Sequence, residues 1–345
     1  MKYLGNKTRL LEFIYSVVVD SNLPKSGTFV DLFSGTGSVG RYFKEKGYRV
    51  ISNDFMTYSL IAQYVLIRLN KMPDFSRVSK EGVLGTLEIL NTLAPVKGYV
   101  FDNFAPSGIA GRQYFSDANA MRIDAIRDQI ENWKKDDLLN NDEYLILVNS
   151  LIDAADFVAN ISGTYGAYLK IWRSMALKEL NLHPPLITDN GLINEVYQED
   201  ANELVRKIRG DIVYLDPPYN QRQYAPNFHM LETLAVWDKQ KLTGKTGQRD
   251  YSSKKSAYSQ KTKAVQAFED LIKNISAKYI ILSYNNEGII SRSDILRVLT
   301  AVGKVEEYTT DYRRFRTERD HEKRHYNTID DMVLEHLFVV KVEEK

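Results

Sequence analysis

The tetrapeptide Asp216-Pro217-Pro218-Tyr219 brings acceptors and an aromatic ring to one point of the chain. Its prolines fix φ and have no N–H, so the Asp216 carboxylate and the Pro217 carbonyl act there only as hydrogen-bond acceptors. Tyr219 adds a flat ring on which an extruded base can stack, for about 1–3 kcal/mol. An exocyclic amine is a donor that fits these acceptors. We therefore interpret the tetrapeptide as a catalytic loop, with a simple turn as the structural alternative.

The element before this loop places it at a sheet edge. Ile212-Val213-Tyr214-Leu215 is a short run of apolar and aromatic residues, which is typical of a buried strand in a parallel sheet. Ligand sites in such sheets lie at the carboxyl ends of the strands. The run therefore predicts that Asp216 faces a ligand.

A second strand and turn near the N-terminus predict a cofactor loop. The run Phe29-Val30-Asp31-Leu32-Phe33 is followed by Ser34-Gly35-Thr36-Gly37 and a helical pattern. A glycine-rich turn between a strand and a helix lets backbone N–H groups approach a ligand. The glycine spacing alone also matches a dinucleotide fingerprint. However, Asp31 at the strand end would repel a pyrophosphate and hold an ammonium, such as that of S-adenosylmethionine.

The strand after this loop supplies a further carboxylate. Residues 49–52 predict a strand that ends before Asp54, which would accept hydrogen bonds from ribose hydroxyls. The alternative is that Asp54 caps the helix that follows.

Three motifs in this order resemble the Dam-like, alpha-group DNA adenine methyltransferases. They are Tyr3-Leu4-Gly5-Asn6-Lys7, the segment from Asp31 to Gly37, and the tetrapeptide at Asp216. In that family the first motif closes over the methionine end of the cofactor, the second cradles it, and the third holds the target amine. The resemblance implies cofactor contacts by Tyr3, Gly5, Asn6, Lys7, Asp31, Phe33, Ser34, Gly35, Thr36, Gly37 and Asp216, and catalysis by Asp216, Pro217, Pro218 and Tyr219.

The family also places an acidic residue against the adenine ring of the cofactor, after the third strand. Asp200 is the candidate here, with Glu199 as the alternative because the register of a short strand is weakly fixed. The alternative is that Asp200 caps a helix, because it begins a capping-box pattern that ends at Glu203.

The alternation of strand and helix patterns predicts an α/β fold. We expect a doubly wound, mostly parallel sheet with an antiparallel edge strand, which the resemblance makes a class I methyltransferase Rossmann-like domain. This domain would comprise residues 1–70 and 187–345. Residues 71–186 show helical spacing, including 117–133, 143–160 and 165–180, and would form an inserted, mainly helical target-recognition subdomain. Its polar faces carry basic residues that could reach bases or phosphates, although such residues more often lie on a solvated face. They are Arg112, Arg122, Arg127, Lys134 and Lys135, with Arg173 and Lys178 further on.

Composition excludes some classes of protein. The chain of 345 residues has no cysteine, so a cytosine ring-carbon methyltransferase, which needs a thiolate nucleophile, is disfavoured. No apolar run is long enough for a membrane span, and the N-terminus lacks a signal-peptide core. We expect a cytoplasmic, nucleoid-associated protein without a membrane partner. The reaction requires no metal.

The net charge of +1 does not indicate a polyanion partner, but local clusters do. A basic stretch from Asp238 to Lys263 includes Lys254 and Lys255, which we expect to track DNA phosphates. Tyr224 and Asn227, which follow the catalytic loop, are candidate contacts to a flipped base. Double-stranded DNA is therefore the expected partner, and a restriction-modification setting would add a separately acting endonuclease.

These observations predict a site-specific DNA adenine-N6 methyltransferase that uses S-adenosylmethionine and yields S-adenosylhomocysteine. Methylation of the cytosine amine or of RNA adenine by the same loop is the alternative reaction. A DNA-binding cofactor sensor without turnover is the alternative from another class, and a nicotinamide dehydrogenase rests on the glycine spacing alone.

Overall fold

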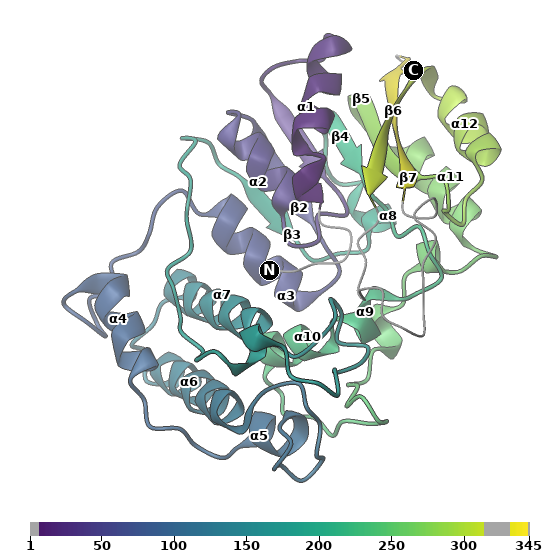
Figure 1. Cartoon of the computed structure of the whole chain (residues 1–345). Coiled ribbons are helices and arrows are strands. Elements are labelled where there is room, and N and C mark those ends of the chain that lie inside the picture. Colours follow the sequence, from purple (N-terminus) through teal and green to yellow (C-terminus); the bar gives the residue numbers. More distant parts are fainter. Residues whose placement is uncertain (1–6, 314–331, 344–345) are drawn as a thin grey trace. The chain divides into compact units, whose positions relative to one another are not determined.

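The computed structural model describes residues 7–313 and 332–343, which form two compact units. The sheet unit contains residues 7–55, Asn190–Gln223 and most of the chain after residue 252. The helical unit contains Met56–Asp189 and Tyr224–Ser252. Figure 1 labels the helices and strands of which the two units consist.

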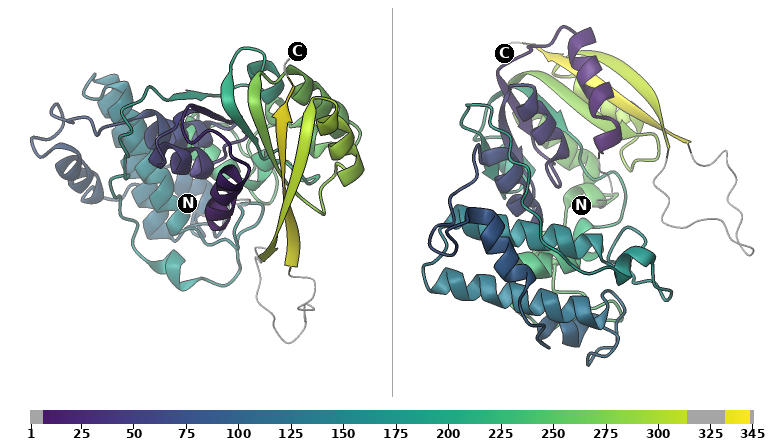
Figure 2. Two further views of the ribbon diagram at one scale, coloured as in Figure 1. Left: turned by 90° about the horizontal axis from the view of Figure 1, so that it is seen from above. Right: turned by 60° about the vertical axis from the view of Figure 1, so that its left-hand side comes forward.

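The sheet unit is built on seven strands in the order β3-β2-β1-β4-β5-β7-β6. The strands are β1 (Thr28–Asp31), β2 (Arg49–Asn53), β3 (Glu195–Tyr197), β4 (Gly210–Leu215), β5 (Ala277–Asn285), β6 (Gly303–Arg313) and β7 (Met332–Val342). The first five in spatial order are parallel, and β7 runs antiparallel to both β5 and β6. Figure 2 shows β6 and β7 side by side. The predicted fold class is confirmed, and the antiparallel strand lies next to the edge strand β6.

Helices cover both faces of this sheet. On one face, Phe29 of β1 stacks on Phe43 of α2 (Ser38–Glu45) with ring centroids 3.7 Å apart, and Phe43 contacts Tyr15 of α1 (Leu11–Asp20). On the other face, Val30, Leu282 and their neighbours pack against α8 (Ala201–Leu204), α11 (Ala264–Asn274) and α12 (Arg292–Thr300). The short turns of this unit are η1 (Lys7–Arg9) and η5 (Ala257–Ser259).

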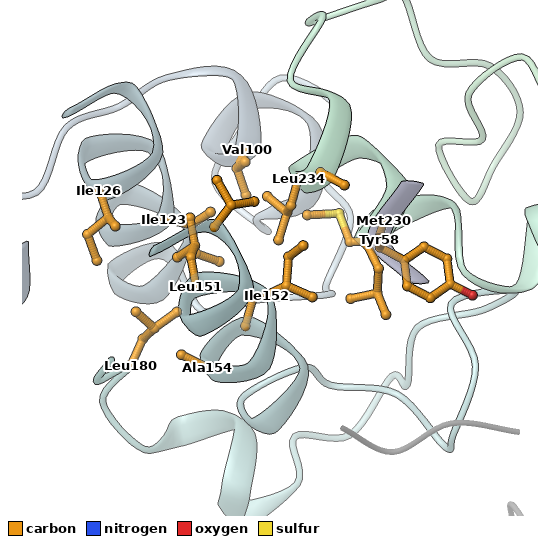
Figure 3. Packing of buried hydrophobic residues seen from close by; sticks show 14 of the residues in the cluster. Tyr58, Val100, Ile123, Ile126, Leu151, Ile152, Ala154, Leu180, Met230 and Leu234 are labelled. Carbon is orange, nitrogen blue, oxygen red and sulfur yellow. The ribbon is translucent and has the colours of Figure 1, made fainter. Parts of the chain in front are cut away.

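The helical unit has its own apolar core. Its elements are α3 (Thr57–Gln63), the π-helix η2 (Tyr64–Arg68), α4 (Gly82–Asn91), α5 (Tyr99–Phe104), α6 (Asp117–Lys135), α7 (Asn141–Phe157), η3 (Ser174–Leu177), α9 (Tyr224–Asn227) and α10 (His229–Val236). A further turn, η4 (Ser252–Lys254), starts at the unit's last residue. Figure 3 shows Ile123 of α6, Ile152 of α7 and Leu234 of α10 in the buried cluster. The helices of this unit therefore fold around a core separate from that of the sheet.

Two sequence predictions for this unit differ from the structure. The segment 165–180 is not a helix: only η3 is helical, and Asn160 bonds the backbone of this segment by accepting from Arg173 N and donating to Leu169 O. Such side-chain bonds to the backbone compete with helix formation, and Gly166 weakens the helix further. The helical unit is also larger than residues 71–186, because α3 and α10 join its core.

Arg127 likewise differs from the prediction of a DNA contact. Its side chain is fully buried, donates to the Leu234 carbonyl at 2.8 Å and to the Tyr144 hydroxyl at 2.9 Å, and is ion-paired with Glu131. A guanidinium with these partners stabilises the unit and has no surface to offer to DNA.

The carboxyl ends of three neighbouring strands are tied together by Asn53, the last residue of β2. Its side-chain amide donates to the carbonyls of Leu32 and Glu199, at 3.2 and 3.1 Å, and its oxygen accepts from Glu199 N at 2.9 Å. Because Asn53 is only 2% exposed, water does not compete for these bonds.

We expect Asn53→Ala to lower the free energy of unfolding by about 1–3 kcal/mol, because it leaves buried backbone groups without partners. Chemical denaturation followed by circular dichroism measures the change. Asn53→Asp is the matched variant: it keeps the size and the acceptor but sets a carboxylate against two carbonyls, so it should destabilise at least as much. Unchanged stability in both variants would contradict this role.

Candidate active site

The site lies where the strand order reverses. β1 pairs with β2 on one side and with β4 on the other, so its carboxyl end is a topological switch point, where ligands of such sheets bind. Asp31 ends β1 and Asp216 follows the last residue of β4. The structure thus brings the two motifs predicted from sequence to neighbouring positions on one sheet edge.

Lys7 supplies the cation beside Asp216. Its side chain is 6% exposed, and its Nζ lies 3.2 Å from Asp216 Oδ1 and 2.6 Å from Oε1 of Glu335, a residue of β7. Burial lowers the pKa of Lys7, but the carboxylates of Asp216 and Glu335 raise it well above its ordinary value. The ammonium is therefore charged at any working pH.

Asp216 is an acceptor held in a nearly dry place. Its side chain is 14% exposed, and its Oδ1 is buried without a hydrogen bond of good geometry from the described residues. Burial raises the pKa of the Asp216 carboxyl to about 6, with the charge of Lys7 lowering it and that of Glu335 raising it. At neutral pH the group is mostly ionised and able to accept a donor.

Asp31 presents a similar carboxylate. The Ser34 hydroxyl donates to its Oδ2 at 2.7 Å and Gly40 N donates to the same oxygen at 3.2 Å. Its other oxygen, Oδ1, is buried and accepts no hydrogen bond from the part of the chain that the structure describes. Burial raises the pKa of Asp31 to about 7. A cationic donor is the ligand that such an oxygen fits.

The glycine-rich turn has the conformation that its sequence predicts. Gly35 and Gly37 have φ values of 53° and 80°, a left-handed region that glycine adopts without strain, and α2 begins directly afterwards. Gly35 N donates to Oδ2 of Asp54 at 3.0 Å, so Asp54 lies at this turn. Asp54 is not the N-cap of α3: that position is Met56, and the first N–H groups of the helix, at Thr57 and Tyr58, donate to Oε2 of Glu232.

The rings around the site come from four segments of the sheet unit. Phe33 meets the buried Tyr258 edge-on at 5.1 Å, and Tyr219 meets Tyr284 edge-on at 6.2 Å. The carbonyl of Tyr219 accepts from Ile289 N at 2.9 Å, which fixes the catalytic loop to the segment after β5. Tyr258, in the basic stretch, is therefore a core residue.

The two acidic residues after β3, Glu199 and Asp200, each have a partner within the sheet unit. Asp200 is exposed and is the N-cap of α8, but its side chain accepts from Asn202 N at 2.9 Å and not from Glu203 N, as the predicted capping box requires. The carboxylate of Glu199 is ion-paired with Lys207. A contact of Asp200 with the cofactor adenine stays a prediction.

The predicted substrate contacts are divided between the two units, with Tyr224 and Asn227 in the helical unit and Lys254 and Lys255 in the sheet unit. Tyr224 and Asn227 form α9 of the helical unit, where the Asn227 carbonyl accepts from Tyr165 N at 2.7 Å. The Lys254 ammonium donates to the Phe55 carbonyl at 2.6 Å, whereas Lys255 is exposed. Tyr3, Gly5 and Asn6 lie outside the described residues.

Sequence reasoning missed Glu335 and Ser283. Ser283 of β5 donates its hydroxyl to Glu335 Oε1 at 2.5 Å, and both residues are buried. The only local signal was one acidic residue within an apolar strand, which does not indicate a partner at the other end of the chain.

Comparison with known proteins decides the family. The model of the D12 class N6 adenine-specific DNA methyltransferases matches residues 3–298. The chain belongs to this family. The matched segment contains all three motifs and ends before β6 and β7.

Named relatives agree with this assignment. The type II methyltransferase M.NlaIII of Neisseria lactamica is 41% identical over 327 residues, which cover 94% of this chain and 95% of that protein. M.CviAII of Paramecium bursaria Chlorella virus 1 is 35% identical over 343 residues, covering 99% of this chain and 98% of that protein. M.FokI of Planomicrobium okeanokoites is 40% identical over 328 residues, covering 93% of this chain and 50% of that protein. The chain thus spans about half the length of M.FokI.

The predictions of an adenine-specific DNA methyltransferase family and of an enzyme are confirmed by this membership. A methyltransferase family implies a methyl donor of the S-adenosylmethionine type. Within the described residues, no helix is long and apolar enough to cross a membrane.

We expect Asp31→Asn to stabilise the ligand-free protein at alkaline pH relative to the wild type. The folded-state pKa of Asp31, about 7, lies above its ordinary value of 3.8, so its contribution to stability is present at low pH and is lost as pH rises through 7. Between pH 5 and pH 8 the difference in unfolding free energy should change by about 2 kcal/mol in favour of the variant. Urea denaturation at the two pH values measures it, and a difference independent of pH would contradict the buried, protonated Asp31.

Proposed function

We propose that this protein transfers the methyl group of S-adenosylmethionine to the exocyclic amine of an adenine in a specific duplex DNA sequence. The observation that carries the proposal is the pair of buried carboxylates at the β1/β4 switch point, Asp31 and Asp216. Among the described residues Asp31 Oδ1 accepts no hydrogen bond, and Asp216 Oδ1 meets the Lys7 ammonium at 3.2 Å without a hydrogen bond of good geometry. One carboxylate suits the cationic end of the methyl donor and the other suits the amine that receives the methyl.

The residues around Asp31 fit S-adenosylmethionine. Asp31 Oδ1 would accept from the ammonium of the methionine part, and the turn at Gly35 and Gly37 would follow its backbone. Asp54, at the same turn, would accept from the ribose. We assign Tyr3, Gly5, Asn6, Phe33, Ser34, Thr36 and Asp200 to the same pocket from the family resemblance. When bound, the cofactor supplies an electrophilic methyl group on a sulfonium and leaves as the thioether S-adenosylhomocysteine.

Asp216, Pro217 and Tyr219 would hold the target base. The Asp216 carboxylate and the Pro217 carbonyl accept the two amine protons, which directs the nitrogen lone pair away from them and toward the methyl group. Tyr219 offers its ring for stacking of the extruded base, and its carbonyl bond to Ile289 keeps the loop in place. Alignment in a nearly dry site then supplies most of the rate increase.

The reaction needs no strong base to remove the proton from the amine. The amine nitrogen forms its bond to the methyl carbon as the carbon–sulfur bond breaks, and its positive charge is stabilised by the adjacent Asp216 carboxylate. The proton that the nitrogen loses passes through that carboxylate to water. No metal is required.

We also propose that the helical unit recognises the DNA target. It carries exposed lysines, among them Lys97, Lys135, Lys170 and Lys178, which can approach phosphates. Tyr224 and Asn227 remain our candidates for contacts to the flipped base, and Lys255 is the stronger phosphate candidate of the basic stretch because it is exposed. A DNA substrate places the activity in the cytoplasm, at the nucleoid, and a restriction-modification role would pair it with a separate endonuclease.

We expect Asp216→Asn to lose methyl transfer by at least about 100-fold at saturating cofactor, because an amide cannot serve as an anionic acceptor. Purified protein, unmethylated genomic DNA and labelled S-adenosylmethionine, followed by modified-base sequencing, measure the transfer. Asp211→Asn is the matched control at the other end of β4, where Asp211 accepts from Thr28 N. Label in cytosine or only in RNA, or full activity of Asp216→Asn, would refute the proposal.

A further inference from the structure

A buried carboxylate outside the sequence motifs contacts the lysine of the site. Glu335 lies on β7, and its side chain is 4% exposed. Its Oε1 is 2.6 Å from Lys7 Nζ and also accepts the Ser283 hydroxyl at 2.5 Å. A glutamate with two partners in the interior is held in one position.

The Lys7 ammonium is closer to Glu335 than to Asp216. The distance to Asp216 Oδ1 is 3.2 Å, compared with 2.6 Å to Glu335, and only the contact with Glu335 is a hydrogen bond of good geometry. Charge-assisted bonds of this type have lengths of about 2.7–2.9 Å. The ammonium therefore donates to Glu335 and acts on Asp216 mainly through its charge.

It matters that the Lys7 ammonium bonds Glu335 and not Asp216, because the Asp216 carboxylate has to accept the substrate amine. A lysine bonded fully to Asp216 would occupy the acceptor oxygen and draw the electron density that the amine needs. A site without any lysine would leave a buried carboxylate unpaired, and such a group takes up a proton. Glu335 avoids both situations: the Lys7 ammonium lies near Asp216, but it donates its hydrogen bond to Glu335.

We propose that Glu335 is a positioning residue, which holds the Lys7 ammonium off full pairing with Asp216 and so keeps the Asp216 carboxylate open to the target amine. The proposal rests on the function proposed above for Asp216. It assigns to β7, which follows the segment matched by the family model, a part in the reaction through Lys7.

The charge on Glu335 also affects the titration of Asp216. Among the described residues, the titratable groups that interact with Asp216 are Lys7 from η1, Tyr214 from β4, Asp31 from β1 and Glu335 from β7. Burial raises the pKa of Tyr214 far above its ordinary value, so it stays neutral. Because Glu335 raises the pKa of Asp216 and Lys7 lowers it, neutralising Glu335 should move that pKa downward.

The decisive variant is Glu335→Gln, which keeps the shape and the oxygen acceptor for Ser283 but removes the charge that attracts Lys7. Glu307→Gln is the matched control: Glu307 of β6 is a carboxylate on the neighbouring strand, paired with Arg292 and with His336. Ser283→Ala is the second variant, which removes one anchor of Glu335 and retains its charge. Thermal melting and cofactor binding establish that each variant is folded.

Two readouts separate a positioning role from a structural one. The first is the single-turnover rate of methyl transfer to DNA at saturating cofactor, measured across pH. We expect Glu335→Gln to lower the plateau rate roughly 10- to 100-fold, as a displaced contact does, and to move the acid limb to lower pH. Ser283→Ala should lower the rate less, without that shift in the limb, and Glu307→Gln should do neither.

The second readout needs no activity. The pKa of the Asp216 carboxyl is followed by carbon-13 NMR of aspartate-labelled protein, with Asp216→Asn used to assign the signal. A lower pKa in Glu335→Gln supports the proposal, and an unchanged pKa overturns it. A lower pKa together with an unaltered transfer rate also overturns it. If the wild type methylates no adenine, the proposed function fails, while the titration still decides whether Glu335 controls Asp216.

Discussion

The free-energy cost of burying several carboxylates away from water governs how this structure is built. Asp31, Asp216 and Glu335 lie at the carboxyl ends of β1 and β4 and on β7, and among the described residues the cation paired with Asp216 and Glu335 is Lys7. Buried carboxylates without full compensation take up protons or bind cations. The raised pKa values of Asp31 and Asp216 express this cost. The same cost is the physical basis of the proposal that the site binds a cationic donor and an amine.

The sheet topology makes this arrangement possible. The order of the parallel strands in the sheet reverses between β1 and β4, which leaves the carboxyl ends of these two strands uncovered by a crossover. The Asn53 side chain ties together the neighbouring ends of β1, β2 and β3. On the other side, β7 runs antiparallel between β5 and β6, so its N-terminal half brings Glu335 close to Ser283 near the end of β5. Residues from distant parts of the chain therefore share one edge.

Local patterns were enough to predict the elements that carry Asp31, the glycine turn and Asp216, because each motif is a strand followed directly by its functional residues. The role of Glu335 could not be predicted, since its partner Lys7 is 328 positions away and only the folded sheet joins them. The segment 165–180 has apolar residues at helical spacing, but Asn160 bonds its backbone in another conformation. Arg127 is a charged residue that the sequence pattern placed on a polar helix face, but its side chain is buried in the core of the helical unit.

The most direct test of this account is the number of protons released when S-adenosylhomocysteine binds, measured by titration calorimetry in buffers of different ionisation enthalpy. A carboxyl with a pKa of about 7 must lose its proton to accept the ammonium of the ligand. The account predicts release of most of one proton near pH 6.5, falling toward zero by about pH 8. Binding without proton release near pH 6.5 would contradict it.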